Sequence, residues 1–311
     1  MAHSVVPGLF SFYAVTVAKR QEIPTTNKGS GYRQNWRQMF QAQTPRSDLG
    51  YAINLAELIF HATVRHIRKS HGNAFIGLMM NIMQAMLFVA IFYLMFSILG
   101  LRSAALRGDF LLYVMSGIFL FMTHTKAMGA VVGAEGPTAP MMQHAPMNTV
   151  ISITSAALSS LYIQLLSAFV ILLIYYTVVG GFIIAKPVGA MAMFLLAWFS
   201  GVAVGMILLA AKPWAPGFVT IASTVYARAN MIASGKMFVA NTLTPQMLAM
   251  FSWNPLFHAI DQERGYVFVN YTPHNSSYQY VLYVSLVLIM IGLMGEFYTR
   301  KHASQSWGAR S

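Results

Sequence analysis

Charged residues are scarce in this sequence. Of its 311 residues, only 9% are Asp, Glu, Lys or Arg, whereas 57% are hydrophobic. A soluble domain carries about 25% charged residues, because its surface must meet water. The scarcity excludes a soluble globule of this size and predicts that lipid solvates much of the chain.

Two other features are absent from the sequence. It has no cysteine, so thiolate metal sites are excluded. It has no Gly-x-x-x-x-Gly-Lys-[Ser/Thr] run, so we expect no phosphate-cradling loop and no bound ATP in this chain. His61, His66 and His71 recur every five residues, which does not keep them on one helical face, so we expect no metal site.

Long uncharged or nearly uncharged runs are abundant instead. A helix needs about 20 predominantly apolar residues to cross a bilayer. Six segments approach or exceed that length, and they predict an all-α polytopic membrane protein with six transmembrane helices. The predicted spans cover residues 74–99, 110–132, 151–179, 188–211, 218–239 and 279–297.

The basic residues predict the orientation of these spans. Nine of the twenty Lys and Arg residues lie between Lys19 and Lys69, and three more close the chain after residue 299. Cytoplasmic flanks carry such an excess, and an even number of spans places both termini on one side. Both termini are therefore expected in the cytoplasm. The net charge of +12 comes with no nucleic-acid recognition motif, so we expect no nucleic acid as a partner.

The segments outside the six-span domain, residues 73–298, have their own patterns. Residues 1–49 are polar, basic and interrupted by prolines, which predicts a flexible cytoplasmic extension. Residues 50–72 place Glu57, His61 and Arg65 on one helical face and apolar residues on another, which predicts an amphipathic helix at the membrane interface. Residues 299–311 are predicted to form a cytoplasmic tail.

The segment that follows the fifth predicted span does not fit a simple loop. Met247–Phe251 is apolar but far too short to cross a membrane. Asn254 and Pro255 then begin a second short helix, because proline suits the first turn of a helix. Two short helices separated by polar breaks predict an outer re-entrant hairpin before the last span.

The hairpin sequence resembles the outer gate of type-2 ABC exporter permeases, and most of all the inner-membrane permeases of capsular polysaccharide export. The likeness extends to the amphipathic helix, the order of the six spans and the Pro-rich linker after the second span, over roughly residues 55–300. The residues that carry it in the hairpin are Gly235, Pro245, Trp253, Asn254, Pro255, His258, Asp261 and Arg264.

This resemblance implies a non-catalytic subunit that moves a capsular or other extracellular polysaccharide across a bacterial inner membrane. ATP and Mg²⁺ would bind a separate ATPase subunit, and this chain would carry no cofactor. The resemblance also implies a second copy of the chain in a homodimer, and a periplasmic adaptor is an expected partner where an outer membrane is present. The ATPase would dock on the cytoplasmic linker, at Pro137, Pro140, His144 and Pro146.

Polar residues within the spans are candidates for the translocation pathway. Asn81, Gln84 and Phe88 share a face of the first span, and Thr224 and Arg228 share a face of the fifth. Buried amides need partners, so helix–helix hydrogen bonding is an equally good account of the first group. An intramembrane cation is costly and by default functional, but Arg228 could also pair with Glu135 or Glu296.

Two further charged groups have simpler expectations. Lys126, within the second span, is expected to extend toward the cytoplasmic head groups. Asp261 and Arg264 lie one helical turn apart, and an ion pair that stabilises the helix is preferred to acid–base catalysis.

Other functions remain open at this point. Exporters of O antigen, lipids or drugs share the hairpin motif. A secondary transporter would need a coupling carboxylate within a span, and the predicted spans lack one except for Glu296 at the end of the last. A membrane scaffold would not need the hairpin.

Overall fold

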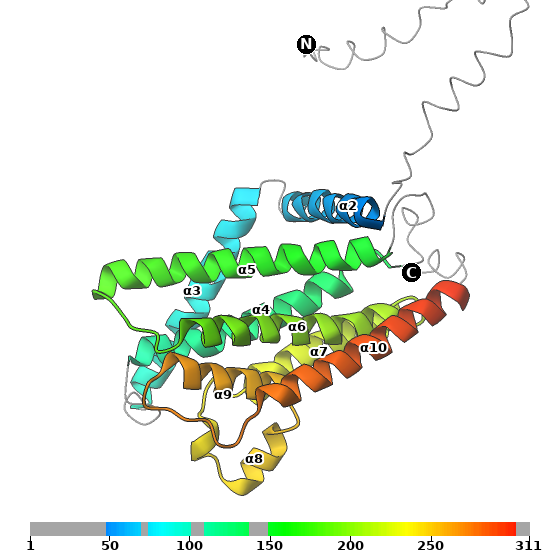
Figure 1. The fold of residues 1–311 in the computed structure, drawn as a ribbon. Coiled ribbons are helices and arrows are strands. Elements are labelled where there is room, and N and C mark those ends of the chain that lie inside the picture. Colours follow the sequence, from blue (N-terminus) through cyan, green and yellow to red (C-terminus); the bar gives the residue numbers. More distant parts are fainter. Residues whose placement is uncertain (1–47, 70–73, 101–108, 137–148, 303–311) are drawn as a thin grey trace, which may run out of the picture. The chain divides into compact units, whose positions relative to one another are not determined.

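The structure, a computed structural model, describes residues 48–69, 74–100, 109–136 and 149–302. Within these ranges every regular element is a helix, so the all-α prediction is confirmed (Figure 1). The chain divides into two units, residues 1–51 and residues 52–311. The described part of the first unit is the opening turn of α2 (Asp48–Lys69), and everything below concerns the second unit.

Among the described residues, five helices are long and apolar enough to cross a membrane, as expected of a polytopic membrane protein. The first four begin and end within two residues of the predicted spans, whereas the fifth runs beyond the predicted end at residue 297. Its additional turn is held by Thr299, whose hydroxyl donates to the carbonyl oxygen of Ala210 at 3.0 Å. The five are α3 (Ala74–Ile98), α4 (Phe110–Val132), α5 (Thr149–Val179), α6 (Pro187–Ala211) and α10 (Tyr278–His302).

The fifth predicted span, residues 218–239, is shorter in the structure. The corresponding helix, α7 (Pro216–Ala233), has 18 residues and is not among the five long apolar helices. At 1.5 Å per residue it measures about 27 Å. It ends because Gly235 adopts φ +75°, a left-handed conformation that glycine takes without steric cost. The predicted boundary at residue 239 was therefore wrong.

Helix α6 lies at the centre of this unit and packs against α4, α9 and α10. Its contact with α4 depends on two glycines four residues apart. A Cβ atom on Gly201 would lie 2.2 Å from the carbonyl oxygen of His124, and one on Gly205 would lie 2.8 Å from the Cβ of Val131. Small residues at this spacing let two helix backbones approach closely, which is how helices commonly associate in membranes.

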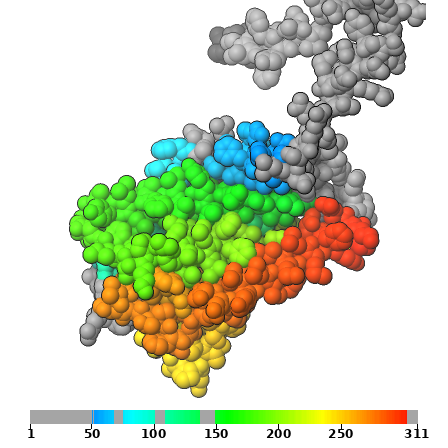
Figure 2. Space-filling model, viewed as in Figure 1, coloured from blue at the N-terminus to red at the C-terminus, as the bar shows by residue number. Residues whose placement is uncertain are grey.

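Two short helices follow α7, as the sequence predicts. Thr244 caps α8 (Pro245–Phe251), and the Asn254 side chain caps α9 (Pro255–Val267) by accepting from the Leu256 N–H at 3.0 Å. Most of α9 is buried, whereas α8 buries none of its residues in the described structure. Figure 2 shows α8, in yellow, projecting from the surface beside α10.

Helix α2 has the two faces that the sequence predicts. Ala62 is buried, while Glu57 and His61 are exposed and lie 3.6 Å apart across one turn. An exposed pair of this kind contributes at most a few tenths of a kcal/mol.

Candidate functional site

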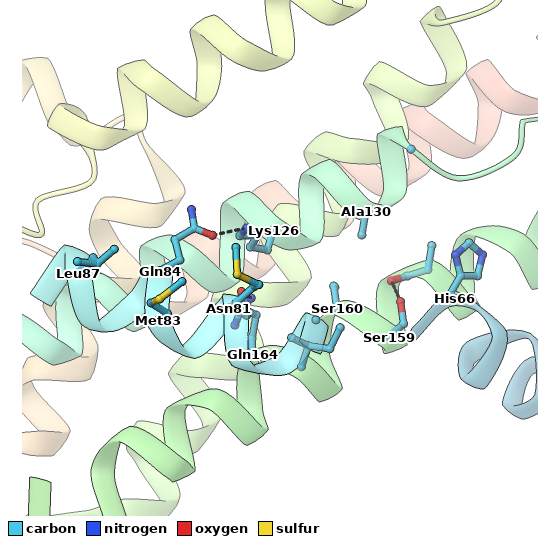
Figure 3. Close-up of a pocket in the computed structure, with 15 residues that line it drawn as sticks. His66, Asn81, Met83, Gln84, Leu87, Lys126, Ala130, Ser159, Ser160 and Gln164 are labelled. Carbon is cyan, nitrogen blue, oxygen red and sulfur yellow. Dashed lines mark hydrogen bonds between the residues drawn. The ribbon is translucent and has the colours of Figure 1, made fainter. Parts of the chain in front are cut away.

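A polar cavity of about 590 Å³ lies between α3, α4 and α5, with one residue contributed by α2 (Figure 3). Amides, hydroxyls and one lysine give it more hydrogen-bonding groups than a packed helix contact needs. The lining comprises His66, Gly77, Met80, Asn81, Met83, Gln84, Leu87, Lys126, Ala130, Gly133, Ala156, Ser159, Ser160, Ile163 and Gln164.

Asn81 joins α3 to α5 at the cavity wall. Its amide nitrogen donates to the hydroxyl of Ser167 at 2.8 Å, and its oxygen accepts from the amide of Gln164 at 2.9 Å. Asn81 is buried, so these bonds offset the loss of its water contacts. Asn81 therefore makes the helix–helix hydrogen bonds that the sequence left open, and it also lines the cavity.

Gln84 joins α3 to α4. The ammonium group of Lys126 donates to the Gln84 side-chain oxygen at 2.7 Å, and Figure 3 shows the two side chains meeting close to Asn81. The expectation that Lys126 extends toward the head groups was wrong, because a nearer acceptor lies on α3. The cavity therefore contains a cation held by a neutral amide.

Phe88 is on the predicted face of α3 but lines a different site. It stacks on Phe92, and both rings surround the ammonium group of Lys236 together with Phe121 of α4. The distances from the Lys236 Nζ to the ring centroids are 5.5 Å for Phe88, 4.5 Å for Phe92 and 3.8 Å for Phe121.

This aromatic cage holds a cation that makes no hydrogen bond to any described residue. Lys236 is buried, and burial lowers its pKa from 10.5 to about 8. A desolvated cation over an aromatic face gains about 2 kcal/mol. Lys236 was not among the predicted site residues, because the aromatic rings that surround it belong to two helices more than a hundred residues earlier in the chain.

Arg264 of α9 holds the turn that follows α7. Its side chain is only 1% exposed. Its guanidinium group donates to three carbonyl oxygens, those of Gly235 at 2.9 Å, Lys236 at 2.7 Å and Phe238 at 2.6 Å. The guanidinium carbon also lies 4.2 Å from the ring centroid of Tyr113. One side chain thus binds three carbonyl groups of the turn, of which that of Gly235 also accepts from the Phe238 N–H.

Asp261 joins the segments before and after α9. One carboxylate oxygen accepts from the Tyr271 hydroxyl and from the Ala240 N–H, and the other accepts from the Ser276 hydroxyl at 2.7 Å. The described residues contain no ion pair between Asp261 and Arg264, so the predicted pair was wrong. Arg264 instead binds the turn before α9, and Asp261 joins Ala240 in that segment to Tyr271 and Ser276 after α9.

Asn254 joins the start of α9 to α7. Besides capping α9, its amide nitrogen donates to the Asn230 side-chain oxygen at 2.8 Å and to the Ala233 carbonyl oxygen at 3.0 Å. The neighbouring Trp253 is 65% exposed. Gly235 is also packed closely, since a Cβ atom there would lie 2.6 Å from the ring of Phe257.

His258 joins α9 to the segment before α10. Its Nε2 lies 2.6 Å from the carbonyl oxygen of Ser252, and its Nδ1 lies 3.1 Å from the backbone nitrogen of Ser277. A carbonyl needs a donor and an N–H needs an acceptor, so the ring is neutral with its proton on Nε2. Burial lowers the pKa of His258 and favours this neutral form, although Asp261 and the Ser252 carbonyl partly oppose the shift.

Thr224 and Arg228 are exposed on α7 and do not line the polar cavity. The Thr224 hydroxyl donates to the Thr220 carbonyl oxygen within the same helix. Among the described residues Arg228 makes no ion pair with Glu135 or Glu296. The structure therefore does not bring the two groups of predicted pathway residues together in one chain. The predicted linker residues Pro137, Pro140, His144 and Pro146 lie outside the described residues.

A second feature absent from the prediction is a buried network that holds α7. The Nδ1 of His124 donates to the Ser200 hydroxyl at 2.8 Å, since that hydroxyl already donates to Ala197. The other ring nitrogen, Nε2, then accepts from the Tyr226 hydroxyl of α7 at 3.0 Å. Three helices meet at one histidine in this way.

Within the described residues, no three His, Asp or Glu side chains are placed to hold a metal ion. We compared the sequence with models of known protein families and with curated proteins, and neither comparison found a match.

Proposed function

We propose that this chain is the membrane subunit of an ATP-driven exporter that moves a capsular or other extracellular polysaccharide across a bacterial inner membrane. The observation that carries the proposal is the pair of short helices between α7 and α10. Arg264 and Asn254 fix α9 to the end of α7, while α8 remains free of burial. A broken segment held in this way suits a gate at one end of a pathway.

The proposal counts α7 as a sixth span. Helix α7 is about 27 Å long, which is close to the thickness of the hydrocarbon core of a bilayer, about 30 Å. Both termini then lie in the cytoplasm, and α8 and α9 form a re-entrant hairpin at the outer side. Lys212, which precedes α7, and Arg264 of α9 each donate to backbone carbonyl groups.

The polar cavity supports a hydrophilic substrate. Hydroxyl groups of a glycan can exchange hydrogen bonds with the amides and serines of the wall, and Lys126 would favour an acidic glycan. The exposed Arg228 on α7 supports a second copy of the chain, because a cation facing lipid is costly unless protein or water covers it. Two copies would place Arg228 beside a shared pathway.

Energy would come from an ATPase subunit that docks on the linker between α4 and α5. The decisive experiment is purification of the tagged chain from its native membranes in a mild detergent. We expect an ATPase with a Gly-x-x-x-x-Gly-Lys-[Ser/Thr] loop to purify with it at a 1:1 ratio. Absence of any ATPase at that ratio would contradict the proposal.

A transport assay separates this proposal from a secondary transporter. In inverted membrane vesicles, glycan uptake should require ATP and continue after an ionophore has dissipated the proton gradient. Uptake that stops with the ionophore while ATP is present would identify a gradient-driven carrier instead. Arg228→Gln should lower uptake of an acidic glycan, with Arg65→Gln, on the exposed face of α2, as the matched control.

A further inference from the structure

A second cavity, of about 240 Å³, lies between α4, α5, α6 and α9. Its walls are almost entirely apolar. Its lining comprises Leu112, Ser116, Phe119, Leu165, Ala168, Phe169, Leu172, Ile184, Pro187, Ala190, Met191, Phe194, Glu263 and Val267. An apolar cavity of about 150 Å³ already stays dry and takes up a small hydrocarbon. This larger cavity can therefore hold a hydrocarbon chain.

One polar group in this cavity has no partner. Glu263 is 7% exposed, and its Oε2 atom makes no hydrogen bond with any described residue. The Ser116 hydroxyl, the other polar side chain in the lining, is satisfied by the carbonyl oxygen of Tyr113 at 2.9 Å. A buried carboxyl group without a hydrogen bond costs free energy, so a ligand that supplies one would be favoured.

Burial also sets the form of that carboxyl group. It raises the pKa of Glu263 well above 4.5, although the charge of the adjacent Arg264 partly opposes the shift. The raised pKa favours the carboxylic acid, whose O–H is a hydrogen-bond donor. The ligand must supply an acceptor next to an apolar chain.

The position of the cavity identifies the source of such a ligand. It lies where α4 and α6 begin and where α5 approaches its end, since Leu112 is near the first turn of α4 and Pro187 opens α6. Phe169, on its rim, is 55% exposed on a helix long enough to span a membrane. The ends of spanning helices lie near the head groups, where the ester groups of glycerolipids are found.

We propose that this cavity holds one acyl chain of a membrane glycerolipid and that the Glu263 carboxyl group donates a hydrogen bond to the ester carbonyl of that chain. A single lipid would thus both fill the apolar cavity and supply a hydrogen-bond partner for the Glu263 carboxyl group. This site is separate from the polar cavity, and the inference does not depend on the transport function proposed above.

A neighbouring cavity provides the control. It has a volume of about 340 Å³ and is lined mainly by apolar residues of α6, α7 and α10, including Ala229. Its Asn230 is satisfied, because the amide donates to the Tyr226 carbonyl oxygen and the side-chain oxygen accepts from Asn254. It resembles the first cavity in polarity, but none of the buried side-chain polar atoms in its lining lacks a hydrogen-bond partner.

The test compares two lipids by native mass spectrometry of the full chain in detergent micelles. One is a phosphatidylethanolamine with ester-linked chains, and the other is its ether-linked analogue, which lacks the carbonyl groups. A net hydrogen bond contributes about 0.5–1.5 kcal/mol. We therefore expect one ester lipid to bind about two- to ten-fold more tightly than one ether lipid. Equal affinities would overturn the proposal.

Three variants locate the effect. Glu263→Leu should abolish the preference for the ester lipid, whereas Glu263→Gln should keep it, because a carboxamide also donates. Ala190→Phe should fill the cavity and weaken binding of both lipids, and Ala229→Phe, in the control cavity, should leave binding unchanged. An unchanged preference in Glu263→Leu would overturn the proposal, and this comparison remains decisive if Ala190→Phe does not fold.

Discussion

Replacing Arg264 with Gln should detach α9 from the turn that follows α7. In the native protein the guanidinium group donates to three carbonyl oxygens within 2.9 Å, and its planar fork reaches all three at once. The glutamine side chain is shorter and has one NH₂ group, so at least one carbonyl group would lose its partner. That carbonyl group would be buried, because the segment is covered by α4 and α9.

The size of the effect follows from these bonds. A hydrogen bond to a charged group contributes about 1.5–3 kcal/mol, and a buried acceptor left without a partner costs about 1–3 kcal/mol. Because the three bonds act on one turn, they are not additive. We expect Arg264→Gln to lower the free energy of unfolding by about 3–5 kcal/mol. Arg264→Lys keeps the charge but not the fork, so its loss should be smaller.

The assay is unfolding in mixed micelles by titration with a denaturing detergent, followed by circular dichroism. Limited proteolysis of residues 234–254 would report local release of the turn. Arg228→Gln is the matched control, because this exposed arginine makes no ion pair with the described residues, and its effect should be about 0.5 kcal/mol or less. Arg264→Gln within about 1 kcal/mol of the native protein would refute the role assigned to this side chain.

Three other changes test separate contacts. Gly201→Ala would force a Cβ atom against the α4 backbone and should lower the free energy of unfolding by about 1–3 kcal/mol in the same titration. Gly129→Ala is the control, because a Cβ atom there would meet open space and should not destabilise the protein. Equal stability of the two variants would rule out the close contact between α4 and α6. Burial lowers the pKa of His258 below 6.5, so the unfolded chain binds a proton more readily and the stabilising contribution is complete above that pH and lost as the pH falls below it. The detergent concentration at the unfolding midpoint should therefore decrease as the pH is lowered from 7.5 to 5.5, and His258→Gln should make this decrease smaller. If the variant shows the same pH profile as the native protein, the pH dependence belongs to another group. Lys126→Gln should lower export of an acidic glycan with little change in stability, and undiminished export would remove the polar cavity from the route.

The helices were predictable because their signal is local. Long, predominantly apolar runs predicted α3 to α6 within two residues, and Asn254-Pro255 predicted the start of α9. The partners of polar side chains were not predictable in this way. Helical spacing placed Asn81 and Phe88 on one face, yet Asn81 lines the polar cavity and Phe88 packs against Lys236. That division depends on which helices lie opposite α3.

The predicted pair between Asp261 and Arg264 failed for a related reason. Spacing along a helix identifies neighbours, but it does not include the carbonyl groups of a turn some 26 to 29 residues earlier in the chain. The α-helical hydrogen-bond pattern stops where Gly235 leaves the helix, so the carbonyl groups of this turn remain available to a strong donor. The glycines of α6 were different, since their four-residue spacing is visible in the sequence and could have predicted a close helix contact.

The way α7 is held bears on how a gate could operate. Among its residues, Val219 and Asn230 are buried in the described structure, so apolar packing contributes little to its position. Lipid competes well with apolar side chains, and polar contacts therefore decide where such a helix lies. For α7 these contacts are the Tyr226 hydroxyl with His124, and Asn230 with Asn254. The contact of Asn230 with Asn254 and the three hydrogen bonds of Arg264 both join the end of α7 to α9. A displacement of α7 would therefore either move α9 with it or break these buried contacts, which include the charged Arg264. Helices α4 and α10 each pack closely against α6 through small residues, so a displacement of α7 that left them in place would have to break the contact between Tyr226 and His124.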